Sequence, residues 1–187
     1  YGYGVVIDSP LPGVTGTKDK IAGNRYDEAK KILTAAGWTF SDKNAVMEKK
    51  NKKETIKLKF SLATGDVPEL KEIAKRIKED WGKIGAQVEL KVFEIGDLNQ
   101  NVIRPRKYDA LFFGEILGFN ADPFPFWHSS QRNDPGLNIT LYTNAKADKI
   151  LDELRGILDE EDRAAKYQDF IREVENDAPA VFVFSPE

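Results

Sequence analysis

The chemistry that this sequence offers is concentrated around one carboxylate, Asp122, in a stretch rich in aromatic residues and proline. A carboxylate so placed can pair with a cationic group of a ligand, such as a peptide amine, through a charge-assisted hydrogen bond. The structural alternative is an Asp-Pro turn, in which the carboxylate accepts local backbone N–H groups. The sequence leaves both roles open for Asp122. Its neighbours between positions 119 and 127 are Phe119, Asn120, Ala121, Pro123, Phe124, Pro125, Phe126 and Trp127.

Phe119, Asn120, Trp127 and Asn138 are the other residues that we predict to contact a ligand. Aromatic side chains give a pocket large apolar walls at little entropic cost, and a loop asparagine can hydrogen-bond a ligand's backbone. The same residues also fit a structural role. In that role the aromatic rings anchor the loop on its own lobe, and Asn138 holds a turn.

Metal, nucleophile and phosphate chemistry find no support in the sequence. His128 is the only histidine and the chain has no cysteine, so the converging ligands that a metal site needs are missing. Ser129 and Ser130 adjoin His128 but stand in no nucleophile-elbow context, and no glycine-rich phosphate loop is present. We therefore expect no metal, no cofactor and no enzymatic activity, with His128 as a loop histidine that is exposed or bonded to backbone.

Hydrophobic periodicity predicts an α/β fold that positions this stretch. Alternation over residues 56–62 indicates a half-buried strand. Asp66 and Glu69 resemble a capping box, which a helical apolar stripe over 67–85 and a strand over 88–95 follow, so the segment is a βαβ unit. Residues 108–113 are almost uniformly apolar and predict a central strand, from whose end the aromatic stretch emerges.

The remaining predicted elements are shorter or lie toward the chain ends. They are a strand over 5–7, a helix over 25–36 between Asn24 and Gly37, a hairpin of 38–40 with 45–48, a short helix over 96–103, helices over 147–158 and 160–176, and a strand over 180–184. The acids at 159–162 suit a helix N-terminus, where they complement the helix dipole. Phe170, Ile171 and Val174 form the expected buried stripe of the last helix, together with Tyr167.

The composition excludes several kinds of partner. Lys and Arg total 28 against 31 Asp and Glu, a net charge of −3, and the charges are interspersed, so the basic footprint of a nucleic-acid binder is missing. No apolar stretch approaches the ~20 residues that span a bilayer. The 187 residues suit one α/β domain, and we expect a piece of a larger protein, with residues 1–24 at a lobe boundary and 25–187 as a single α/β lobe.

Several motifs together resemble the extracytoplasmic solute-binding proteins of ABC importers, of the oligopeptide and dipeptide type (family 5). In chain order they are YDEAKKILTAAGW at 26–38, IGAQVEL at 84–90 within its strand–helix–strand setting, residues 108–118 followed by Asp122-Pro123 and Asn138, and YTNAKADKILDEL at 142–154. Their order and spacing are more specific than any one of them alone.

The resemblance implies one lobe of a type II periplasmic-binding-protein-like clamshell, with a mixed sheet covered by helices. It implies a monomer that captures an oligopeptide or dipeptide in a cleft by hinge closure and delivers it to a membrane permease. It also places the protein outside the cytoplasm, in the periplasm or as a cell-surface lipoprotein, with the signal segment upstream of this chain. Family members grip the peptide amine with an acid a few positions before the Asp-Pro pair. Here Asp122 is the only acid between Gly118 and Pro123, so it either takes this role or the role is absent.

Three alternatives stay open beside peptide transport. An oligosaccharide-binding member of the same family would stack Trp127 and the nearby phenylalanines on sugar rings. A glycoside hydrolase would need Asp122 and Glu115, the acids near the aromatic stretch, at a separation of ~5–9 Å. A module that binds a partner without transporting anything is the third, because a fold does not fix a function.

Overall fold

The chain folds into two compact units. The computed structural model describes residues 4–11, 13–14, 16, 25–117 and 122–185. One unit comprises Ala22–Glu115, and the other combines Tyr1–Ile21 with Ile116–Glu187. The expected organisation, with residues 1–24 at a lobe boundary and 25–187 as one lobe, stays a prediction. Val5 and Val6 pair with Ser185 and Phe184, and Leu11 is buried in the core of the second unit.

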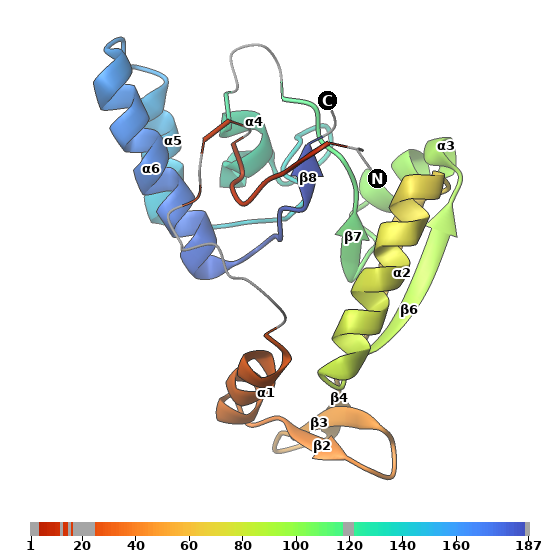
Figure 1. Cartoon of the computed structure of the whole chain (residues 1–187). Helices are drawn as coiled ribbons and strands as arrows, with labels where there is room; N and C mark the ends of the chain where they lie inside the picture. Colours follow the sequence, from red (N-terminus) through yellow and green to blue (C-terminus); the bar gives the residue numbers. More distant parts are fainter. Residues whose placement is uncertain (1–3, 12, 15, 17–24, 118–121, 186–187) are drawn as a thin grey trace. The chain divides into compact units, whose positions relative to one another are not determined.

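A parallel three-stranded sheet forms the centre of the Ala22–Glu115 unit. Its strands are β5 (Lys59–Gly65), β6 (Gln87–Phe93) and β7 (Ala110–Phe112), in the order β6-β5-β7. Helix α2 (Pro68–Lys83) connects β5 to β6 and lies along the sheet (Figure 1). Phe60 and Trp81 meet edge to face, with ring centroids 5.2 Å apart. The predicted βαβ unit is confirmed.

The strand predicted over residues 56–62 is divided between two sheets. Its first part is β4 (Thr55–Lys57), which joins β2 (Thr39–Ser41) and β3 (Val46–Lys50) in an antiparallel sheet. Leu58 lies at the transition, because its N–H donates to Met47 of β3 while its carbonyl accepts from Gln87 of β6. The alternating pattern therefore continues across a change of hydrogen-bonding partner.

Two further predictions for this unit are wrong. Residues 108–113 were expected to hold the central strand, but β5 is the middle strand and β7 pairs with it alone in the described sheet. The residues of β7 are only half-buried, so the apolar run fixed neither full burial nor the place in the strand order. The capping box is also absent, because Pro68 starts the helix with Val67 as N-cap, and the Asp66 carboxylate pairs with Lys71 instead.

The short elements of this unit agree with prediction. Helix α1 spans Tyr26–Ala35, and Gly37 behind it has a positive φ of 85°. Helix α3 (Ile95–Asp97) continues into a π-helix over Leu98–Ile103.

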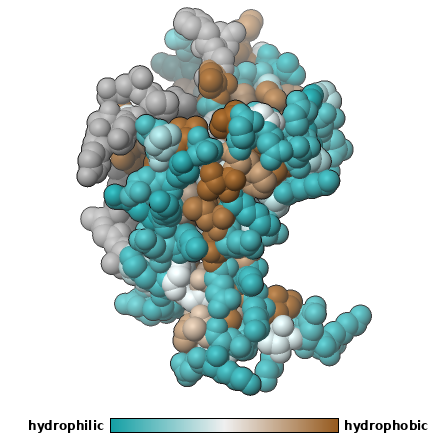
Figure 2. Space-filling model, turned by 90° about the vertical axis from the view of Figure 1, so that its right-hand side faces the viewer, coloured by the Kyte–Doolittle hydropathy of each residue, from teal (hydrophilic) through white to brown (hydrophobic). Residues whose placement is uncertain are grey.

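On the face drawn in Figure 2, hydrophobic residues appear in limited groups among hydrophilic ones, in keeping with the interspersed charges.

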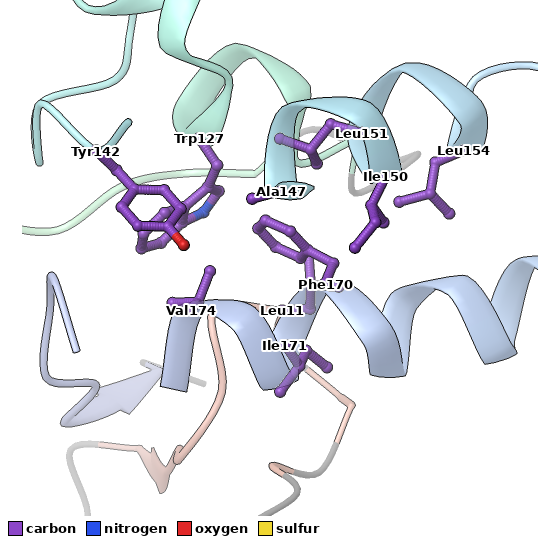
Figure 3. Packing of buried hydrophobic residues seen from close by; sticks show 10 residues of the cluster. All are labelled: Leu11, Trp127, Tyr142, Ala147, Ile150, Leu151, Leu154, Phe170, Ile171 and Val174. Atoms are coloured by element: carbon purple, nitrogen blue, oxygen red, sulfur yellow. The ribbon is translucent and has the colours of Figure 1, made fainter. Parts of the chain in front are cut away.

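The other unit is built around two helices, α5 (Ala145–Leu154) and α6 (Glu160–Asp177), which lie side by side in Figure 1. The short helix α4 (Phe124–Trp127) and a 3₁₀ turn over Ser129–Gln131 precede them, and β1 (Val5–Val6) pairs with β8 (Phe184–Ser185). Figure 3 shows the core of this unit, whose buried side chains are Leu11, Trp127, Tyr142, Ala147, Ile150, Leu151, Leu154, Phe170, Ile171 and Val174.

The ends of α6 show one success and one error of prediction. Asp159 is the N-cap, and its carboxylate accepts the N–H groups of Glu161 and Asp162, as expected for an acidic helix start. The strand predicted over 180–184 is reduced to Phe184–Ser185, and Val181 is 81% exposed. The cause is the short partner β1, which supplies only two paired residues.

Candidate functional site

Asp122 lies at the start of α4 with its carboxylate engaged on both oxygens. Oδ1 accepts the N–H of Phe124 at 3.0 Å, and Oδ2 lies 3.8 Å from Nε of Arg155. The side chain is still 41% exposed. The turn-forming role of Asp122 is thus present in the structure, while part of its side chain is exposed.

Trp127 belongs to the hydrophobic core and is only 3% exposed. Its ring meets Tyr142 and Phe170 edge to face, with centroids 6.1 and 6.0 Å apart (Figure 3). Phe182 lies at 6.0 Å. These surroundings match the loop-anchoring alternative, because almost none of the ring's surface is left for a solute.

Asn138 is fully buried and joins two segments of backbone. Its carboxamide nitrogen donates to the carbonyls of Trp127, His128 and Tyr142 at 3.1–3.2 Å. Its Oδ1 accepts the N–H of Tyr142 and the hydroxyl of Thr140. Both the nitrogen and the oxygen of the side-chain amide are therefore hydrogen-bonded within this unit. This arrangement fits the structural alternative for Asn138.

The remaining predicted contacts, Phe119 and Asn120, lie outside the described residues. They fall within positions 118–121, directly before Asp122, whose contacts are described.

His128 is bonded to backbone, as predicted. Its Nδ1 accepts the N–H of Ser130 at 3.1 Å and lies 2.7 Å from that residue's hydroxyl. Its Nε2 lies 4.0 Å from Asp148 and 3.8 Å from Asp152, and the ring stacks on Phe124 with centroids 4.3 Å apart. Within the described ranges, no group of three potential metal ligands has a geometry that could hold an ion.

Sequence reasoning missed the face of α5 that receives this loop. Asp148 accepts both the N–H and the hydroxyl of Ser129, at 2.8 and 2.6 Å. Arg155, at the end of the same helix, approaches Asp122 and Phe124. The charged residues 148, 152 and 155 follow the i, i+4, i+7 spacing of one helix face, a signal that was available in the sequence.

In the other unit, the carboxyl ends of the parallel strands carry three acids, of which Asp66 follows β5 and pairs with Lys71. Glu94 follows β6 and accepts the N–H groups of Gly96 and Asp97, so it caps α3. Glu115 follows β7 and is exposed.

In the described part of the chain, no helix is long and apolar enough to cross a membrane.

Comparison with known proteins places this chain among solute-binding proteins. The model of the family described as "Bacterial extracellular solute-binding proteins, family 5 Middle" matches residues 1–138. Oligopeptide-binding protein AppA of Bacillus subtilis is 30% identical over 165 residues, which are 86% of this chain and 30% of that protein. Heme-binding protein A of Haemophilus influenzae is 28% identical over 183 residues, 95% of this chain and 31% of that protein.

Solved structures agree with this assignment. The structure of Bacillus subtilis AppA in complex with a nonapeptide matches with a TM-score of 0.84 and 28% identity, over 99% of this chain and 37% of that one. Campylobacter jejuni NikZ in complex with Ni(L-His) matches with a TM-score of 0.80 at 24% identity, over 97% of this chain and 36% of that one, and supports the fold alone. The predicted fold class, α/β of the type II periplasmic-binding-protein kind, is confirmed.

This chain spans about a third of the length of these relatives. The family model nevertheless covers well over half of the chain, and the similarity to AppA extends over most of it. The chain belongs to the bacterial extracellular solute-binding proteins of family 5.

Proposed function

We propose that the protein containing this chain is the solute-binding component of an ABC importer. It captures an oligopeptide or dipeptide outside the cytoplasm, in the periplasm or at the cell surface, and delivers it as a monomer to a membrane permease. The observation that carries this proposal is the likeness to AppA, described with a bound nonapeptide, over 99% of this chain. No catalytic step belongs to the proposal.

The proposed mechanism is capture by closure. A ligand that contacts two lobes stabilises the closed arrangement by its differential affinity for it, and a permease can then discriminate the loaded state. Phe119, Asn120 and Asp122 are the residues of this chain that we propose to meet the peptide directly. Trp127 and Asn138 then contribute by holding the loop, since their side chains are buried and occupied by their own unit.

Asp122 is proposed to accept a donor from the peptide's amino terminus. One of its oxygens holds the Phe124 N–H and the other faces Arg155, while 41% of the side chain is exposed. A carboxylate has about four lone-pair sites, so these two contacts leave acceptor capacity for an ammonium group. The role of binding the peptide amine, which the resemblance implies for an acid, is therefore chemically open to Asp122.

Heme is the second candidate solute, because heme-binding protein A is 28% identical over 95% of this chain. The local chemistry of the described residues favours it less. His128 is the only histidine of the chain, and its side chain is 14% exposed with Nδ1 already bonded to Ser130. Axial ligation by this chain would require His128 to give up that arrangement.

The test uses the whole protein that contains this chain. Thermal unfolding is recorded with a pool of peptides of two to nine residues, with hemin, with Ni²⁺ plus L-histidine, and with a set of oligosaccharides. Peptides at 100 times their dissociation constant should stabilise the protein by about 2.7 kcal/mol, a rise in midpoint of several degrees. Stabilisation by hemin or by sugars alone would reject peptide transport. Release of reducing sugar ends from the same oligosaccharides would instead support the hydrolase alternative.

A further inference from the structure

Arg155 contacts the beginning of the candidate loop in two ways. Its Nε lies 3.8 Å from the Asp122 carboxylate, and its guanidinium carbon lies 4.5 Å from the centroid of the Phe124 ring. A guanidinium over an aromatic face gains from the ring quadrupole in addition to its ion pair. One cation at the end of α5 thus holds both the carboxylate and the aromatic ring that follow residues 118–121.

The Phe124 ring is packed by a second group as well. His128 stacks on it nearly parallel, with centroids 4.3 Å apart and an interplanar angle of 16°. Asp148 fixes Ser129, the residue after His128, through two hydrogen bonds. Helix α5 therefore contacts both ends of the stretch 122–129. Arg155 contacts its first residue, Asp122, and Asp148 accepts hydrogen bonds from its last residue, Ser129.

The two contacts differ in how exposed the side chains that make them are. Asp148 is 19% exposed and holds a backbone N–H, whereas Arg155 is 58% exposed and its partner Asp122 41% exposed. Loss of the Arg155 contact would leave the Asp148 end in place. Pro123 is fully buried, so the backbone at the start of the stretch is anchored, but the Asp122 carboxylate is held from another element by one exposed side chain, Arg155.

We propose that Arg155 is a positioning residue for peptide binding: it fixes the orientation of the Asp122 carboxylate without touching the peptide itself. This inference rests on the proposed function, because it assigns Arg155 to the same site. It predicts that the charge of Arg155 alone is insufficient. A lysine keeps the charge but lacks the planar group that both pairs with a carboxylate and stacks on a ring.

The first measurement needs no ligand. The backbone N–H of Phe124 donates a hydrogen bond to the Asp122 carboxylate. Its hydrogen exchange is followed in the whole protein and in the Arg155→Gln and Arg155→Lys variants. Losing an exposed ion pair and a cation–π contact should accelerate this exchange about fivefold in Arg155→Gln. Arg155→Lys should give an intermediate rate. Arg172→Gln is the control, because Arg172 forms a similarly exposed pair with Asp169 on α6 and should leave the Phe124 amide unchanged. An unchanged rate in Arg155→Gln would overturn the proposal.

The second measurement uses tetra-alanine and N-acetylated tetra-alanine in calorimetry. Arg155→Gln should bind tetra-alanine about fivefold more weakly and lose most of the preference for the free amine, while Arg155→Lys regains part of both. Tighter binding of tetra-alanine by Arg155→Gln would overturn the proposal, because Arg155 would then compete for Asp122. Equal preference in all variants would overturn it too. If the unmodified protein binds neither these two peptides nor the peptide pool, the peptide function is rejected, and the exchange rates still decide whether Arg155 positions Asp122.

Discussion

The side-chain amide of Asn138 donates a hydrogen bond of 3.2 Å to the backbone carbonyl of Trp127, so a buried asparagine binds the last residue of α4, whose side chain lies in the core. Both residues lie in the unit that contains α5 and α6. Trp127 and Asn138 were predicted to contact a ligand, yet both side chains are buried. Removing either one should therefore change the stability of this unit directly, and ligand binding only through the shape of the loop.

Asn138→Ala should destabilise this unit by about 2–3 kcal/mol, since it leaves buried backbone groups without partners. The groups concerned are the carbonyls of Trp127 and Tyr142, whereas the N–H of Tyr142 keeps the hydroxyl of Thr140 as a partner. Hydrogen exchange over residues 127–142 in the whole protein measures the effect locally. Asn133→Ala, on the exposed part of the same loop, serves as control and should change stability by less than about 0.5 kcal/mol. Equal effects of the two substitutions would argue against a structural role of Asn138.

Trp127→Ala should cost about 3–5 kcal/mol, the range for removing a large aromatic side chain from a packed core. Trp127→Phe should cost less, because most of the buried area stays filled. The comparison with ligand binding is decisive for the two roles weighed for this residue. A pocket wall would lose peptide affinity in Trp127→Phe at unchanged stability, whereas a core residue loses stability with peptide affinity preserved under folded conditions. Urea denaturation and calorimetry on the same variant distinguish them.

The pH dependence of the sheet in the other unit follows from Asp109. Its carboxylate accepts the N–H and the hydroxyl of Ser61, both at 2.8 Å, and these bonds lower the pKa of Asp109 below its ordinary value of 3.8. A lowered pKa in the folded state means that the stabilisation is present above the unfolded value. It is lost as pH falls from about 4 through the lower folded pKa.

Ser61→Ala removes the hydroxyl donor, so the pKa of Asp109 should rise toward 3.8. The loss of stability that Asp109 causes on acidification should therefore be smaller and should end at a higher pH than in the unmodified protein, because its onset is set by the unchanged unfolded value. Carboxyl NMR titration of Asp109 checks the pKa, and thermal midpoints between pH 3 and 6 check the stability. A titration of Asp109 that is identical in both proteins would contradict the assigned cause.

Asp122→Asn tests the ligand contact while keeping an oxygen for the Phe124 N–H. If the carboxylate meets a peptide ammonium group, the affinity for a free-amine peptide should fall by about tenfold to 100-fold, the worth of a charge-assisted hydrogen bond. Binding of the N-acetylated peptide should be unaffected. Thermal midpoints of the unliganded variant provide the control for folding. Equal losses for both peptides would assign Asp122 a purely structural role.

The sequence predicted features that repeat along one element, and it failed where two elements meet. Phe170, Ile171 and Val174 were expected to be buried because their spacing fits one helix face, and they are. Leu58 shows the opposite case, since alternation along a strand cannot reveal that its hydrogen bonds change from one sheet to another. The βαβ unit was readable because a parallel crossover needs a covering helix of this length.

The same distinction explains the candidate site. Asp122 was singled out because a carboxylate stands out in an aromatic stretch, and Asn138 because an asparagine suits a loop; their contact with a ligand stays a prediction. Arg155 was missed because it is an ordinary charge at the end of an amphipathic helix until α4 is packed beside it. Asp66 was assigned a cap that its carboxylate does not make, because Pro68 moves the helix start beyond its reach. Contacts between elements depend on the tertiary structure, and the spacing of residues within one helix or strand does not reveal them.

The last prediction concerns this chain by itself. Its 187 residues cover 37% of the AppA chain that was described with a bound nonapeptide. If the proposed capture needs contacts from two lobes, the 187-residue chain alone retains only part of the binding free energy. Each 1.4 kcal/mol of missing contacts weakens affinity tenfold. We therefore expect calorimetry to detect weak peptide binding or none for the isolated chain, and clear binding for the whole protein. Circular dichroism of the isolated chain must first show native helix content. Micromolar binding by the folded chain would mean that it contains a complete site.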